Sequence, residues 1–466
     1  MKGIFTNSTG ILVSRVAGFA RDFTTASILG ANIYSDIFFV AIKIPNLFRS
    51  VFADGAFTQA FLPSFVAAKY KGAFSVNVFL RIFCAVLILS LLATIFSEYL
   101  TAAIALGFDE ATIKTAAPFV AVNFWYLDFV FLISFLAALL HYRNSFAAPA
   151  FSTALLNVSM IIALIIARGE NEKTIVWFLS FGVLIGGALQ LLLHIAALKG
   201  KRLGAMLLGG FKKKRDSKAD TDRFYKAFFP AVFGASTAYV SAFLDTLLAT
   251  FLAVGSVSYL YYANRIFQLP LALFAIAVSM ALFPAIAKAI KRGDMGESKR
   301  LLSKNFWLLA FLLSLSALGG ALLSDGIIWL LFERGKFARA DTSAAANILA
   351  IYMIGLTPFG LARLFSLWLY STARQGLAAK NSAIALGFNI LFSLAFIKPL
   401  GVSGLALAGA LTGVILLFLS AKALGWQTVL GMIRAKLVFA LAIAVALEAL
   451  AIEGFKLAVN YRGFFG

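Results

Sequence analysis

Thirteen apolar runs occupy most of the chain, and this pattern constrains the fold more than any other feature of the sequence. A helix needs about 20 apolar residues to cross a bilayer, and these runs are too long and too continuously apolar for barrel strands. Hydrophobic residues make up 62% of the 466 residues, which excludes a soluble globule. The runs lie at residues 4–31, 34–66, 77–106, 115–140, 146–167, 174–198, 225–253, 257–290, 304–332, 343–372, 381–397, 402–424 and 434–454.

Basic residues alternate in density between successive loops. The loops after even-numbered runs, together with the adjoining ends of the runs, carry 24 Lys and Arg, whereas those after odd-numbered runs carry 7. The positive-inside rule therefore places the N-terminus and the even-numbered loops in the cytoplasm. Topology and contact with anionic lipid then explain most of the net charge of +21, without nucleic acid as a partner. The densest run, KKKRDSKAD at 212–220, is expected to be a solvated cytoplasmic linker.

A weak internal repeat relates the two halves of the chain. FLPSFVAAKYKG (61–72) resembles LFPAIAKAIKRG (282–293), and VAIKIPNLF (40–48) resembles YANRIFQLP (262–270). Six runs followed by six in the same orientation predict an all-α membrane protein with two parallel six-helix lobes around a central cavity. The expected divisions are an N-terminal lobe at 1–198, a cytoplasmic linker at 199–224, a C-terminal lobe at 225–425, and an additional C-terminal helix and tail at 426–466.

Several charged side chains fall inside apolar runs, where each costs several kcal/mol. Arg15 is roughly 11 residues, or about 16 Å, from either end of its run, which is too far for its side chain to reach the surface comfortably. A surplus of positive charge predicts a cavity for an anionic substrate, because the arginine fork suits phosphate oxygens. The alternative is that each arginine pairs with an acid, as Arg15 could with Asp22 seven residues on. The candidate residues are Arg15, Arg21, Lys43, Arg49 and Arg265, with Asp22 and Asp36 as acidic neighbours.

Three segments resemble the MurJ/MviN proteins, bacterial flippases of the peptidoglycan precursor lipid II within the multidrug/oligosaccharidyl-lipid/polysaccharide exporter superfamily. They are RVAGFARD (15–22), SDIFFVAIKIPNLFRSVFADGAFTQAFLP (35–63) and SVSYLYYANRIFQLP (256–270), and the likeness extends through the twelfth run. The resemblance implies two six-helix lobes around a cavity. It also implies that Arg15, Arg21, Arg49 and Arg265 are the important cavity arginines, with Asp22, Asp36 and Lys43 close by.

The chain departs from this family in two respects. The family usually has fourteen helices, the last two of which form a groove for the lipid tail, whereas thirteen runs predict an outward C-terminus. Some relatives also carry a sodium site, for which Asp245, Asn389 and Ser393 are the candidates here. A hard cation prefers anionic oxygen, so serine in place of a second carboxylate does not favour sodium. With one cysteine, Cys84, and two isolated histidines, we expect no disulfide, no metal site and no cofactor.

We therefore expect a flippase rather than an enzyme, moving lipid II by alternating access from the cytoplasmic to the outer leaflet of the bacterial inner membrane. The cationic cavity would bind the diphosphate head group, and the membrane potential would act on the cycle with about 2.3 kcal/mol per charge per 100 mV. Membrane lipids and cell-wall synthesis proteins are the other expected partners, and the chain is expected to be a monomer.

Alternative functions are another polyprenyl-linked polysaccharide flippase, a multidrug antiporter, a membrane enzyme acting on polyprenyl-phosphates, or a scaffold of the cell-wall machinery. An antiporter of cationic drugs would favour membrane carboxylates, and the predicted cavity has the opposite sign. An enzyme would need clustered acids for metal binding or acid–base work, whereas the acids of this sequence are scattered. A scaffold would leave the buried arginines unexplained.

Overall fold

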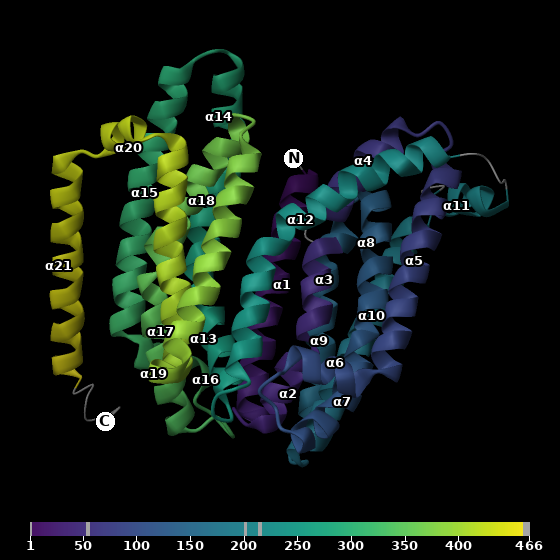
Figure 1. Cartoon of the computed structure of the whole chain (residues 1–466), viewed down its shortest axis with the longest axis horizontal. Coiled ribbons are helices and arrows are strands. Elements are labelled where there is room, and N and C mark those ends of the chain that lie inside the picture. Colours follow the sequence, from purple (N-terminus) through teal and green to yellow (C-terminus); the bar gives the residue numbers. More distant parts are fainter. Residues whose placement is uncertain (1, 53–55, 200–202, 213–216, 460–466) are drawn as a thin grey trace. The chain divides into compact units, whose positions relative to one another are not determined.

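The computed structural model describes residues 2–52, 56–199, 203–212 and 217–459, and all regular secondary structure in these ranges is helical (Figure 1). Each of the thirteen predicted runs lies largely within one helix or within adjoining helices, which confirms the all-α membrane architecture. Residues 213–216 of the expected linker at 212–220 lie outside the described residues, whereas Lys212 is the last residue of α11 and Lys218 is the first of α12. Eight helical segments in these ranges are long and apolar enough to cross a membrane, or nine if one bent helix pair is a single span.

The chain forms two compact units. The N-terminal unit is Met1–Gly255 with Arg334–Phe337, and the C-terminal unit is Ser256–Glu333 with Ala338–Gly466. The helices of the N-terminal unit are α1 (Lys2–Leu29), α2 (Ile33–Ala41), α3 (Lys43–Phe52), α4 (Ala56–Ala67), α5 (Lys71–Ile95), α6 (Ser97–Ile104), α7 (Glu110–Phe124), α8 (Tyr126–Tyr142), α9 (Ala147–Ile166), α10 (Glu172–Leu198), α11 (Leu203–Lys212) and α12 (Lys218–Ala249). Those of the C-terminal unit are α13 (Ser256–Pro270), the π-helix η1 (Leu271–Ile276), α14 (Ala277–Lys291), α15 (Met295–Leu322), α16 (Ser324–Phe332), α17 (Arg339–Ile354), α18 (Leu356–Ser371), α19 (Gln375–Leu424), α20 (Trp426–Met432) and α21 (Ala435–Ala458).

The boundary between the units lies at Gly255, whereas the predicted boundary was the linker at 199–224. Aromatic packing of α12 accounts for the difference. The ring of Phe224 lies 5.8 Å from that of Phe57 on α4, and the ring of Phe228 stacks 6.2 Å from that of Phe52 on α3. Such aromatic pairs contribute about 0.5–1.5 kcal/mol beyond the burial of their area. Helix α12 therefore belongs with the helices that precede it, not with the predicted lobe at 225–425.

Breaks and kinks interrupt several of the predicted runs. The run at 77–106 forms α5 and α6 with a break at Phe96, and the run at 115–140 forms α7 and α8 with a break at Trp125. Helix α19 instead joins two predicted runs, and a kink at Gly401, with φ 56° and ψ −134°, marks the point where they meet. Glycine adopts such a positive φ without the steric cost that other residues incur.

One short segment joins the N-terminal unit although its flanking helices belong to the other unit. Within Arg334–Phe337, the Lys336 amide donates to the Ser27 carbonyl near the end of α1 at 2.9 Å, and the Lys336 ammonium contacts Glu172 of α10 at 2.7 Å. The Arg334 guanidinium lies over the ring of Phe23. Gly335 has a positive φ of 62°, and a Cβ there would overlap the Ser27 carbonyl. This segment therefore fixes the C-terminal end of α1.

Candidate substrate-binding site

Close packing of α1 against α9 positions the first group of candidate residues. A Cβ on Gly10 would lie 2.5 Å from the Cβ of Ala150, so only glycine permits this approach. One turn further on, the Ser14 hydroxyl donates to the Ala150 carbonyl at 2.9 Å. The Asn157 side-chain amide donates to the Ser14 carbonyl at 3.3 Å, which orients its own carbonyl oxygen toward Arg21. Two polar side chains in apolar runs thus join the helices that carry the site.

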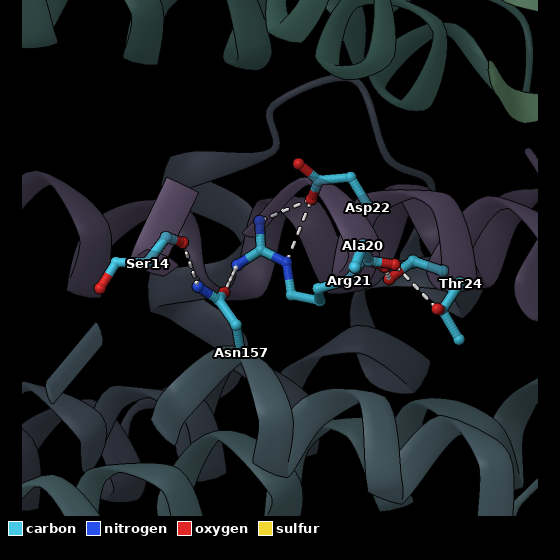
Figure 2. A network of polar contacts seen from close by, with 7 residues as sticks. Ser14, Ala20, Arg21, Asp22, Thr24 and Asn157 are labelled. Atoms are coloured by element: carbon cyan, nitrogen blue, oxygen red, sulfur yellow. Dashed lines mark hydrogen bonds and ion pairs between the residues drawn. The ribbon is translucent and has the colours of Figure 1, made fainter. Parts of the chain in front are cut away.

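The Arg21 guanidinium is held on both sides, as Figure 2 shows. Its Nη1 donates to Asn157 Oδ1 at 3.0 Å, and its Nε and Nη2 donate to Asp22 Oδ1 at 3.1 and 2.5 Å. The Asp22 side chain is only 1% exposed, so this ion pair is desolvated. Asp22 therefore neutralises Arg21, and the structure does not pair it with Arg15. Asn157 was not predicted as a site residue, although a lone asparagine inside the run at 146–167 was a signal for it.

Arg15 differs from Arg21 although both lie on α1. It is exposed, and it makes no hydrogen bond or ion pair with any residue that the structure describes. Its position near the middle of the helix is too deep for the side chain to reach a surface easily. The guanidinium of Arg15 is therefore available to an anion from outside the described chain.

The remaining candidate cations of the N-terminal unit lie on α3. Lys43, its first residue, is half-buried, and the carboxylate that acts on it electrostatically is Asp245 of α12. Arg49 and Arg21 both act electrostatically on the hydroxyl of Tyr126, the first residue of α8. Tyr126 is almost completely buried and donates to Gln190 at 3.3 Å. The two arginines thus lie near the same buried side chain, a proximity that their spacing in the sequence did not reveal.

Asp36, on α2, is held by the backbone of the segment that follows α12. Its side chain is 3% exposed, and its Oδ2 accepts a hydrogen bond from the Gly255 amide at 2.7 Å. This contact ties α2 to the segment that follows α12. Asp36 therefore stabilises the junction at the end of the N-terminal unit, whatever further part it has in binding.

The residues proposed for a cation are divided between the units. Asn389 and Ser393 lie one turn apart on α19, both are buried, and the Ser393 hydroxyl has no partner among the described residues. Asp245 belongs to the N-terminal unit, where Lys43 already places a positive charge near it and so disfavours a second cation. Within the described ranges, no three His, Cys, Asp or Glu side chains lie close enough to hold a metal ion.

Arg265 is the one candidate cation in the C-terminal unit. It lies on α13, five residues before Pro270, and is half-buried. The π-helix η1 follows directly after Pro270, and π-helical turns occur frequently at functional sites. The expectation that Arg265 shares a cavity with Arg15 and Arg21 stays a prediction.

Long apolar helices in two units, with charged side chains inside the runs, define a polytopic all-α membrane protein. A solved inward-facing multidrug transporter of the MATE family has this fold, with a TM-score of 0.74 at 11% identity, covering 91% of this chain and 98% of that one. The family model for the lipid II flippase MurJ matches residues 25–464. The chain therefore belongs to the MurJ family.

Similar proteins span nearly the whole length of the chain. A probable lipid II flippase MurJ of Helicobacter pylori strain J99 is 49% identical over 422 residues, covering 88% of this chain and 92% of the relative. A probable lipid II flippase MurJ of Haemophilus influenzae is 32% identical over 460 residues, covering 93% and 88%. A solved lipid II flippase MurJ in an inward closed conformation matches the fold with a TM-score of 0.80 at 23% identity, covering 99% of both chains.

Proposed function

We propose that this chain moves lipid II from the cytoplasmic to the outer leaflet of the bacterial inner membrane by alternating access. Membership of the MurJ family supports the substrate, and the fold shared with inward-closed and inward-facing transporters supports the mechanism. The N-terminus and the basic loops would face the cytoplasm, as the distribution of Lys and Arg indicates. The C-terminus would face outward, and the chain would act as a monomer.

The observation that carries this proposal is the exposed Arg15 guanidinium near the middle of α1, which has no partner among the described residues. A cation at this depth is costly unless it faces water or an anionic ligand. A diphosphate supplies oxygens of the geometry that the arginine fork binds in pairs. Arg15 is therefore proposed to bind the diphosphate directly, together with Arg49 and Arg265.

Arg21 and Lys43 would contribute differently, because acids already stand near them. Asn157 and Asp22 fix the orientation of the Arg21 guanidinium through hydrogen bonds from three of its N–H groups. Asp245 acts on Lys43 electrostatically without forming an ion pair within 4.0 Å. A diphosphate near α3 could then become the counterion of Lys43 while Asp245 stays in place.

Reconstituted vesicles test the function directly. The purified chain would be incorporated with lipid II that carries a label on its peptide, and the accessibility of the head group on each face would be followed with time. We expect movement of unmodified lipid II, verified by mass spectrometry of the recovered lipid. A polyprenyl-diphosphate sugar without the peptide is the comparison substrate. Equal movement of both would favour a general polysaccharide flippase, and chemical conversion of lipid II would show an enzyme.

A further inference from the structure

A polar cluster inside the N-terminal unit has no part in the site described above. It lies where two helical spans break, at the end of α5 and at the start of α8. Asp128 stands 18 residues after Glu110 and 14 before Tyr142 in the joined span of α7 and α8, and is therefore near its middle. Broken helices at this depth are where transporters build their ion sites, because the break frees backbone groups and admits polar side chains.

Asp128 is buried with one carboxylate oxygen satisfied and the other without a partner. Its side chain is 8% exposed, and its Oδ2 accepts a hydrogen bond from the Ser90 hydroxyl of α5 at 2.6 Å. Its Oδ1 is completely buried and has no hydrogen-bond partner in the part of the chain that the structure describes. An ionised carboxylate in such a place needs a counter-charge or several donors, and a single serine supplies neither in full. The second oxygen is therefore a place where a proton can bind.

No charged side chain among the described residues compensates Asp128. Helix α8 packs against α3, α4, α5, α7 and α10. The ionisable groups of these helices nearest their middles are Arg49 on α3 and Arg81 and Cys84 on α5, and α4 has none. The others lie toward helix ends: Lys43, Lys71, Glu110, Lys114, Glu172, Lys173 and His194, with Tyr126, His141 and Tyr142 on α8 itself. None of them hydrogen-bonds or forms an ion pair with Asp128.

A short polar path leads from the exposed part of α5 to this carboxyl group. The Trp125 indole, at the break between α7 and α8, donates to the Thr94 hydroxyl at 3.1 Å. Thr94 is exposed and donates in turn to the carbonyl of Ser90 at 2.8 Å. Thr94 and Ser90 lie one turn apart on α5, so polar atoms extend from an exposed position to the residue that contacts Asp128.

We propose that Asp128 is a proton-binding site of the N-terminal unit and that Ser90 is the residue that positions it. A proton from water would bind the free Oδ1 and return to water when the carboxyl group ionises, with no other bond formed or broken. A metal cation fits poorly, because only two side chains offer oxygen here and hard cations take more. This inference goes beyond lipid II movement, and its primary test needs no lipid II.

Infrared difference spectroscopy of the full chain in lipid bilayers tests the site. The stretching band of a protonated carboxyl group would be recorded while the pH is raised over the range in which the chain stays folded. We expect a buried-carboxyl band that disappears with rising pH and is missing in Asp128→Asn. The exposed control Glu110→Gln should retain it. A band that persists at every pH, the lack of such a band, or its survival in Asp128→Asn would overturn the proposal.

Serine variants separate positioning from general packing. Ser90→Ala removes the hydrogen bond to the carboxyl group, so the band should move to higher frequency. The matched control Ser134→Ala lies on α8, where the buried hydroxyl donates only to the carbonyl of Val130, and its band should stay in place. An unmoved band in Ser90→Ala would show that Ser90 does not contact the titrating group. Loss of lipid II movement in the unaltered chain would refute the proposed function but leave these spectra as they are.

Discussion

Helices α1 and α21 are both long and unbroken, yet they differ in apolar character and in the charges that they carry. Helix α21 is among the eight segments apolar enough to span, and none of its residues is buried. Figure 1 shows it at the edge of the C-terminal unit, where it packs against α15. Helix α1 is not among those eight, carries Arg15, Arg21 and Asp22 in its middle, and is tied by side-chain hydrogen bonds to α9.

The difference shows what a charge inside a membrane helix requires. On α1, Arg21 keeps its charge because Asp22 and Asn157 supply oxygens to it. Helix α21 has a single acid near its middle, Glu448, and this side chain turns toward α15, where Gly319 leaves space for it. Arg21 is thus paired, whereas Arg15 makes no hydrogen bond or ion pair within the described chain. If lipid II is the missing partner, changes on α1 should affect transport far more than changes on α21.

Removal of the Arg15 charge should have the largest effect. Charge-assisted hydrogen bonds contribute roughly 1.5–3 kcal/mol each, so Arg15→Ala should weaken head-group binding by about ten- to a hundred-fold and abolish measurable lipid II movement. Arg15→Lys should restore only part of the activity, because lysine lacks the two-pronged fork. The matched control is Arg434→Ala at the start of α21, which should transport normally. Near-normal movement by folded Arg15→Ala would contradict a binding role for this residue.

The second prediction concerns how Arg21 is held. Asn157→Leu keeps the volume but removes the hydrogen bond to Nη1, so the guanidinium stays beside Asp22 yet loses its fixed orientation. We expect lipid II movement to fall by about ten-fold, the lower end of the range for one charge-assisted bond, and Asn157→Asp to lose less because it still accepts. The assay is the same vesicle measurement, normalised to inserted protein. An unchanged rate in Asn157→Leu would show that Asp22 alone is sufficient to position Arg21.

Sequence patterns predict the helices of this fold well and its long-range contacts poorly. Run length and hydropathy locate the helices, because a membrane imposes the same requirement on each of them. The cations on α1 and α3 are also evident from the sequence, because charged residues are rare in such apolar runs. The placement of α12 with α3 and α4 depends on contacts between phenylalanines that are far apart in the chain. The hydrogen bond between Arg21 and Asn157 likewise joins residues that are 136 positions apart. Neither contact leaves a local pattern.

Valine substitutions compare the packing of the two helices themselves. On α1, Gly10→Val would force side-chain atoms into Ala150 of α9, and such overpacking costs about 1–3 kcal/mol. On α21, a Cβ at Gly454 meets nothing within 4 Å, so Gly454→Val should change stability by less than about 0.5 kcal/mol. The thermal unfolding midpoints of the two variants in the same detergent give the comparison. Equal midpoints would show that α1 can move away from α9 without loss.

The smallest expected effect lies where Lys336 contacts Glu172, beside the fixed end of α1. The hydrogen bond from Lys336 lowers the pKa of Glu172 below its ordinary value of 4.5. Because the folded-state pKa is the lower one, the pair stabilises the fold fully above pH 4.5 and loses this contribution as the pH falls through the folded value. The two side chains are 38% and 40% exposed, so water and salt limit the stabilisation to roughly 0–1 kcal/mol. Glu172→Gln should therefore lower the unfolding midpoint slightly at neutral pH and not at acidic pH. Lys336→Met should match it, and the double variant should add nothing further. A midpoint difference that persists in acid would show that Glu172 stabilises the end of α10 without Lys336, and that the segment Arg334–Phe337 holds α1 through its backbone alone.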